Sequence, residues 1–247
     1  AATLLIMSSC KNKVAKEDST KLNNLPEWAL GGFVRPEGIN PVITPNPLTM
    51  FDCPMQKAAV GWAESDTFNP AAVVKDNKIY VLYRGEDNSA TGIGKRTSRI
   101  GLAESADGLQ MNCRITPVMY PDEDNVKEFE WPGGCEDPRV CVTEDGLYVM
   151  LYTTWNRKTA RLSVATSRDL INWKKHGPAF ATAYAGRFKY LPCNPGSLVT
   201  MVVNRKQFFP KFNDNYFILC GRLLLYPFLF YPFPLPLPLS TFPLPSF

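Results

Sequence analysis

The sequence predicts an all-β fold built from repeated units, and three observations lead to this prediction. Two β-prone hairpins span residues 71–84 and 139–153, and each follows a polar residue and a proline. The polar residues, Asn69 and Asp137, lie 68 residues apart. A further strand follows each hairpin, and both of these strands contain Ser-x-Asp. Repeats of about 60 to 70 residues, with about four short strands each and no helical period, are typical of β-propeller blades.

The individual strands follow from local composition. Lys-Asp-Asn-Lys forms the turn of the first hairpin and Glu-Asp-Gly that of the second, and both are hairpin signals. The strands after the hairpins span residues 98–111 and 160–173. A third unit begins at residues 193–203, and residues 215–221 supply its second strand. A β-sandwich with chance similarity between the hairpins is the alternative, but the matched order of dipeptide, hairpin and Ser-x-Asp favours a propeller.

Both ends of the chain differ from this pattern. Residues 1–24 resemble the end of a bacterial lipoprotein signal and a flexible tether, in which Cys10 is lipidated and anchors the protein in the cell envelope. The alternative is an apolar terminus without meaning, on a cytoplasmic protein. Residues 222–247 carry proline at every second or third position, which excludes a helix and a central strand, so we expect an aberrant tail. About three blades fit into residues 25–221, whereas a closed propeller needs at least four, so we expect a truncated propeller.

Composition excludes several classes of function. The 247 residues are 45% hydrophobic and 20% charged, with a net charge of +4, which is ordinary for one globular domain. Basic clusters on one face are absent, so we expect no nucleic-acid partner. Seven cysteines form no CxxC pair and His176 is the single histidine, so we expect no metal site. No GxSxG, P-loop, HExxH or dinucleotide motif occurs, and we expect no cofactor.

The candidate site lies where the innermost strands of the units begin, because these positions converge on one central pocket in a propeller. Asn69, Asp137 and Asn194 occupy those positions. Glu136 and Arg139 flank the Asp137-Pro138 pair, and two glycines before them allow a close approach of backbone to ligand. Cleavage of a sugar needs carboxyl groups with separated pKa values. For Asp137 the alternative is a turn cap with a structural salt bridge to Arg139.

Further candidates come from the neighbouring strands. The segment RGED supplies Arg84, Glu86 and Asp87 at the end of the first hairpin. Aromatic residues that could stack on a sugar face are Tyr152, Trp155 and Trp131. A pocket of carboxylates, arginines and aromatics without metal ligands indicates carbohydrate.

Six segments together resemble glycoside hydrolase family 130, the β-mannoside phosphorylases and β-1,2-mannosidases. They are WALGGFVRPEGINPVI, FNPAAVVKDNKIYVLYRGED, SRIGLAESADG, GGCEDPRV, TARLSVATSRDLINWKKHGPAF and GSLVT, in order between residues 28 and 221. The resemblance implies a five-bladed propeller and an inverting reaction with Asp137 as general acid, whose proton reaches the glycosidic oxygen through a mannose hydroxyl. It also implies that Asn69, Arg84 and Asp87 line the mannose subsite, with Arg139 beside the acid.

The resemblance leaves the type of reaction open. A phosphorylase needs cationic residues for inorganic phosphate as co-substrate and releases mannose 1-phosphate, whereas an inverting hydrolase needs a carboxylate base. His176 looks structural, and the lipoprotein-like start resembles Bacteroides-type members, so we favour hydrolysis of a β-mannoside oligosaccharide. Residues 193–197 replace the lysine of a common family motif with Asn194-Pro195, and residues 219–222 lack a carboxylate base that family members carry. A non-catalytic glycan-binding propeller and an inactive truncated chain therefore remain as alternatives.

Overall fold

The computed structural model describes residues 35–92, 94–181, 185–186, 189–190, 192, 196–204, 206–211, 216 and 218–219. The chain divides into two compact units, residues 1–40 and 41–247. In the first unit the side chain of Asn40 donates to the carbonyl of Pro36. The second unit holds every strand described below. The predicted lipoprotein segment with Cys10, the position of Asn194 and the predicted tail lie outside the described residues.

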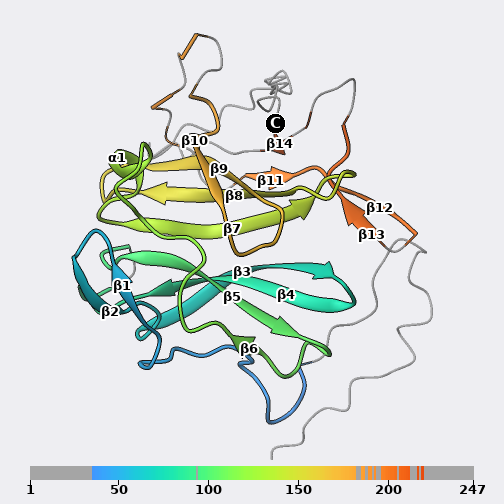
Figure 1. Ribbon diagram of the computed structural model, residues 1–247, viewed down its shortest axis with the longest axis horizontal. Coiled ribbons are helices and arrows are strands. Elements are labelled where there is room, and N and C mark those ends of the chain that lie inside the picture. The colour runs from blue at the N-terminus through green and yellow to red at the C-terminus, as the bar shows by residue number, and fades with distance from the viewer. Residues whose placement is uncertain are drawn as a thin grey trace, which may run out of the picture. The chain divides into compact units, whose positions relative to one another are not determined.

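Two antiparallel four-stranded meanders form the centre of the second unit (Figure 1). The first consists of β3 (Asp66–Lys75), β4 (Lys78–Glu86), β5 (Ser98–Ser105) and β6 (Asn112–Cys113). The second consists of β7 (Gly134–Val142), β8 (Tyr148–Trp155), β9 (Ala160–Ser167) and β10 (Lys174–Pro178). One parallel pair, Ser98 with Gly134, joins β5 to β7. The all-β prediction is confirmed, because α1 (Lys127–Glu130) is the only helix among the described residues.

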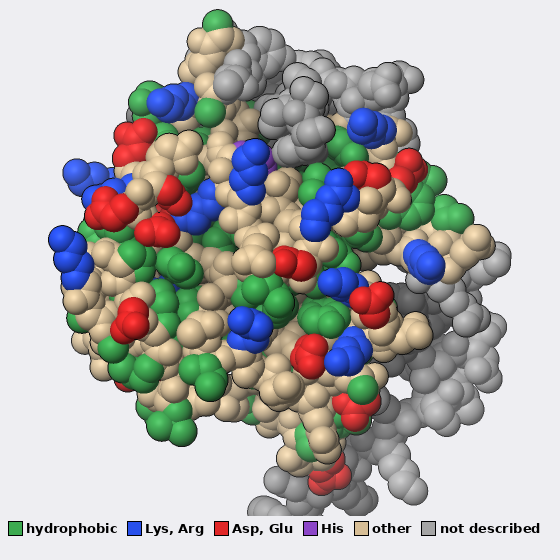
Figure 2. Space-filling view, in the orientation of Figure 1, with side chains coloured by type: hydrophobic (Ala, Val, Ile, Leu, Met, Phe, Trp, Pro, Cys, Tyr) green, Lys and Arg blue, Asp and Glu red, His purple; other side chains and the backbone are tan. Residues whose placement is uncertain are grey.

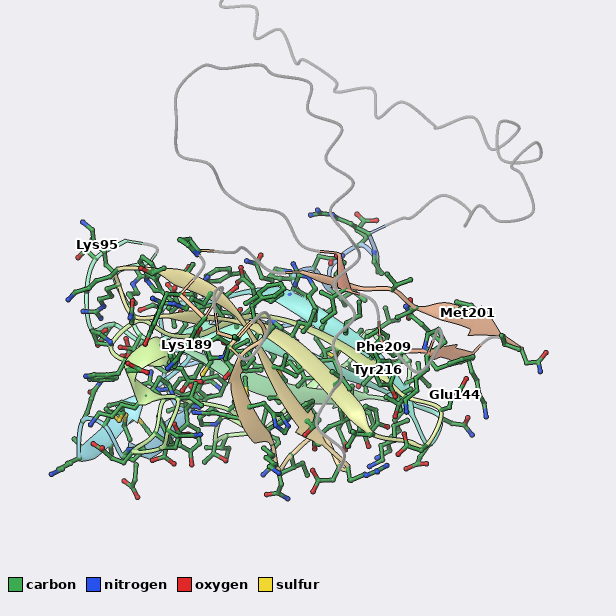
Figure 3. The ribbon with its side chains drawn as sticks, turned by 90° about the horizontal axis from the view of Figure 1, so that it is seen from above. Lys95, Glu144, Lys189, Met201, Phe209 and Tyr216 are labelled. Atoms are coloured by element: carbon green, nitrogen blue, oxygen red, sulfur yellow. The ribbon has the colours of Figure 1, made fainter. Side chains whose placement is uncertain are left out.

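Shorter hairpins flank the meanders. They are β1 (Met50–Cys53) with β2 (Ala58–Gly61), β11 (Ser197–Leu198) with β14 (Ile218–Leu219), and β12 (Met201–Val203) with β13 (Lys206–Phe208). Residues 218–219, within the segment predicted as a second strand, pair with β11, but β12 and β13 come between them in the chain, so β14 is not the second strand after β11. The β12–β13 hairpin was not predicted, and it turns at Asn204, whose φ is +50°. Phe209 and Tyr216 lie together beside it, with ring centroids 4.4 Å apart (Figure 3).

The repeat predicted from the sequence is also a repeat of backbone conformation. Asn69 and Asp137 both adopt left-handed φ angles, +46° and +51°, and each lies at a bulge that shifts the register of its hairpin. Asparagine and aspartate tolerate this conformation better than other non-glycine residues. The turn of the first hairpin at Asp76 and Asn77 has two positive φ angles, as a type I′ turn requires. The feature that both units share is the left-handed residue at the bulge, Asn69 in the first unit and Asp137 in the second.

The Ser-x-Asp segments form matching turns. Ser105 accepts from the backbone N–H of Gly108, and Ser167 accepts from that of Leu170, in both cases at 2.9 Å. Gly108 and Leu170 have nearly equal positive φ angles of +78° and +72°. In each turn the aspartate accepts from the backbone N–H groups two and three residues further along the chain.

Three clusters of buried apolar side chains hold the second unit together. The first lies between the two meanders and combines Leu82 and Ile100 with Cys135, Met150 and Tyr152. The other face of the first meander packs on β1 and β2 through Phe51, Trp62, Tyr83 and their neighbours. The other face of the second meander packs on the segment around Phe209. Figure 2 shows basic and acidic side chains interspersed on the face in view. None of the described helices is long and apolar enough to span a membrane.

Candidate active site

Asp137 is the centre of the candidate site. The bulge in β7 turns its carboxyl group toward the first meander, where two side chains bind the same oxygen. Asn69 Nδ2 donates to Asp137 Oδ1 at 2.8 Å, and Arg84 Nη1 lies 3.2 Å from the same Oδ1. The Asp137 side chain is 18% exposed. The structure thus brings three of the predicted site residues together from β3, β4 and β7. Both contacts use Oδ1. Considering the described residues, Oδ2 is therefore the oxygen that remains for a ligand.

Arg84 is a buried cation shared by three carboxylates. Its Nη2 lies 2.6 Å from Glu86 Oε1 and 2.8 Å from Glu136 Oε1, while Nη1 faces Asp137. The guanidinium also stacks over the ring of Phe68, 4.5 Å from its centroid. Cation–π stacking and charge-assisted hydrogen bonds together fix this group in one orientation.

Ser98 contacts Arg84 and two of its three carboxylate partners, Glu86 and Glu136. Its hydroxyl accepts from Arg84 Nε at 3.0 Å and lies 3.2 Å from Glu86 Oε1 and 3.1 Å from Glu136 Oε1. A hydroxyl has one proton to donate, so it can satisfy only one of the two carboxylates at a time. Arg96 contacts the other oxygen of Glu86 at 3.4 Å.

Burial changes the protonation of this cluster. Burial raises the pKa of Glu136 to about 7, which the charge of Arg84 opposes and the negative charge of Asp137 reinforces. A buried carboxyl group beside an ionised one is the arrangement that separates two pKa values. Glu136 therefore carries a proton over a pH range in which an exposed glutamate is ionised.

Asp87 and Arg139 lie outside this cluster of contacts. Asp87 is buried and forms an ion pair with Arg99 at 2.9 Å. Burial alone would raise the pKa of Asp87, but hydrogen bonds from Ser89 and the charge of Arg99 outweigh burial and lower it. Arg139 Nη1 donates to the carbonyl of Pro138 at 2.9 Å. The ion pair that Asp137 forms is with Arg84, not with Arg139 as the structural alternative supposed.

Tyr152 does not offer a ring face to a sugar in this structure. It is fully buried between the meanders, and its hydroxyl donates to Glu130 at 2.8 Å. Glu130 in turn binds Lys175 at 2.6 Å. We predicted Tyr152 as a sugar-binding residue because its aromatic ring could stack on a sugar face, but the side chain belongs to the core. His176 lies on β10, where its Nε2 is 2.8 Å from Thr166 Oγ1.

Two members of the cluster, Ser98 and Phe68, were not predicted as site residues. Glu86 was a candidate, but its contact with Arg84 was not predicted, although residues 84 and 86 share one face of the strand. Ser98 had no comparable signal, because its contact with Glu136 depends on how the two meanders pack. Among the described residues, no three His, Cys, Asp or Glu side chains are arranged to hold a metal ion.

Comparison with known proteins identifies the family of this chain. The family model described as beta-1,4-mannooligosaccharide phosphorylase matches residues 35–227. The chain belongs to glycoside hydrolase family 130. The match includes every side chain of the cluster around Arg84, and it confirms the resemblance carried by the sequence motifs.

Similar proteins of the family include hydrolases and a phosphorylase. The crystal structure of a glycosyl hydrolase from Bacteroides ovatus is 57% identical with a TM-score of 0.77, and the match covers 81% of this chain and 56% of that one. A family 130 structure described with glycoside hydrolases that target β-1,2 mannosidic linkages in Candida mannan is 58% identical, with the same TM-score and coverage. A 1,2-β-oligomannan phosphorylase from Thermoanaerobacter sp. is 36% identical over 127 residues, which is 50% of this chain and 41% of that protein. This chain thus spans about half the length of these relatives.

Proposed function

We propose that this chain carries the proton-donating part of an active site that cleaves β-1,2-mannosides with inversion, with Asp137 as the general acid. The observation that carries the proposal is the contact set of Asp137. Asn69 and Arg84 hold one carboxyl oxygen, and the other remains for a ligand. A general acid needs a fixed position and an atom that a substrate can reach, and these contacts supply both.

We further propose that the two meanders are two blades of a five-bladed propeller, of which this chain contains about three. Their matching bulges and Ser-x-Asp turns support a blade repeat, as does the TM-score of 0.77 to structures of the same family. In this arrangement Asn69 and Arg84 bind the mannose residue at the cleaved bond, and Arg139 lies beside the acid. Asp87 lies behind these residues, on the side away from the mannose. Its ion pair with Arg99 supports the end of β4.

Hydrolysis is favoured over phosphorolysis by the degree of similarity. The structure described with β-1,2-targeting hydrolases is 58% identical to this chain, whereas the oligomannan phosphorylase is 36% identical over half of it. In the hydrolytic reaction the glycosidic oxygen takes the proton of Asp137, directly or through a mannose hydroxyl, as its bond to the anomeric carbon breaks. Water attacks that carbon from the opposite face and gives its proton to the carboxylate base that an inverting hydrolase requires. Inorganic phosphate would replace water in the phosphorylase alternative.

The test is incubation of the protein with β-1,2-mannobiose, with and without phosphate. We expect mannose in both conditions and its loss in Asp137→Asn. Asp145→Asn is the matched control, because Asp145 lies on an exposed turn and pairs with Arg168. Mannose 1-phosphate formed only with phosphate would identify a phosphorylase. Binding of the disaccharide without any product would replace the enzyme by a glycan-binding propeller.

A further inference from the structure

The cluster around Arg84 holds more negative charge than positive charge. Glu86, Glu136 and Asp137 all lie within 3.2 Å of its guanidinium. Arg96 supplies a second positive charge through the outer oxygen of Glu86. Arg96 also pairs with Asp66, so with every group ionised four carboxylates would face two guanidinium groups. A bound proton reduces this excess of negative charge, and the remaining question is which carboxyl group carries it.

Glu136 and Asp137 are the two groups between which that proton can be shared. The two residues are adjacent in β7, and Arg84 reaches both with different nitrogens, Nη2 and Nη1. The contacts of Glu136 with Arg84 and Ser98 both use Oε1, so Oε2 can carry a proton. The negative charge of Asp137 raises the pKa of Glu136, in addition to the larger effect of burial. This repulsion between the two charges acts on both groups.

We propose that Glu136 is a positioning residue that holds one proton jointly with Asp137, so that the proton-donating site stays loaded up to neutral pH. This inference rests on the proposed function, in which Asp137 donates a proton to the glycosidic oxygen. A negative charge on Glu136 disfavours a second negative charge on Asp137, and therefore favours the state in which Asp137 carries the proton. The charged or polar groups that face Glu136 are Arg84 and Glu86 from β4, Ser98 from β5 and Asp137 itself.

The first test is the pH dependence of kcat/KM on β-1,2-mannobiose for the wild type and Glu136→Gln. A neutral glutamine cannot repel a charge on Asp137, so the alkaline limb of the profile should move to lower pH. We expect the ratio of variant to wild-type activity to fall about fivefold between pH 4.5 and pH 7, the effect at pH 7 of moving a limb near pH 7 down by about one pH unit. Glu136→Asp, which keeps the charge, should recover part of the neutral-pH activity. Glu144→Gln, on an exposed turn, is the matched control.

A merely structural role gives a different result. If Glu136 only supports the fold of the site, Glu136→Gln lowers activity by the same factor at both pH values. That outcome overturns the inference and leaves Asp137 as the acid.

The second test does not depend on catalysis. Carbon-13 NMR of the carboxyl groups follows Glu136 and Asp137 separately as the pH is changed. We expect Asp137→Asn to move the titration of Glu136 to lower pH, and Glu136→Gln to do the same to Asp137. If these titrations are independent of each other, proton sharing is wrong even in an active enzyme. If they are coupled but no mannoside is cleaved, the proposed function fails and the proton sharing stands.

Discussion

Replacement of Arg84 by methionine should destabilise the protein by about 3–5 kcal/mol, the cost of removing one partner from a buried ion pair. The Arg84 side chain is only 5% exposed, and Glu86 beside it is fully buried. The variant leaves Glu86, Glu136 and Asp137 facing one another without their shared cation. It also removes the stacking on Phe68, worth about 0.5–2 kcal/mol. Methionine fills most of the volume, so the loss reports the charge and not a cavity.

The assay is urea unfolding at pH 7 and pH 4, with Arg168→Met as the matched control. Arg168 forms an ion pair with Asp145 at 2.9 Å, like that of Arg84, but both partners are more than half exposed. Exposed pairs contribute about 0–1 kcal/mol. The loss in Arg84→Met should shrink at pH 4, because the unpaired carboxylates then take up protons. A loss at pH 7 no larger than that of Arg168→Met would refute the reasoning.

Two further predictions concern residues of β7. Since the pKa of Glu136 rises from 4.5 in the unfolded chain to about 7 on folding, the free energy of unfolding should fall by about 3 kcal/mol as the pH rises from 4.5 to 7. Glu136→Gln should lack this decrease in urea titrations, and equal slopes in the two proteins would contradict the assigned pKa. Gly134→Ala should lower the melting temperature far more than Gly146→Ala. Both glycines have positive φ, but a Cβ at Gly134 would collide with the backbone of β5, whereas nothing lies within 4 Å of one at Gly146. Similar melting temperatures would show that β5 and β7 can separate at their junction.

The repeat and the centre of the site could be predicted from the sequence, because both depend on local signals. The turn residues of the two hairpins, the bulge dipeptides and the Ser-x-Asp turns each act within a few residues of chain. Asn69 and Asp137 could be placed together because equivalent positions in two packed repeats lie side by side. Their hydrogen bond of 2.8 Å is the direct outcome of that equivalence.

The predictions that were wrong or missing concern residues whose roles depend on packing between the meanders. Every residue of β8 from Tyr148 to Thr154 is buried, so alternation along the strand could not show that Tyr152 faces the core. The role of Ser98 arises from contacts with residues 14 and 38 positions away in the chain. The break between β11 and β12 within residues 197–203 likewise had no turn signal, because no glycine or proline marks it.

The matching turns at Gly108 and Leu170 bear on how such repeats are recognised after long divergence. The two apex residues share a left-handed conformation although one is glycine and the other a fully buried leucine. The serine and aspartate hydrogen bonds impose the conformation, and burial in the core offsets its cost at the leucine. The apex of this turn therefore accepts either glycine or leucine, whereas both turns use the same serine and aspartate contacts. Searches for further copies of this turn should weight Ser-x-Asp and ignore the apex residue.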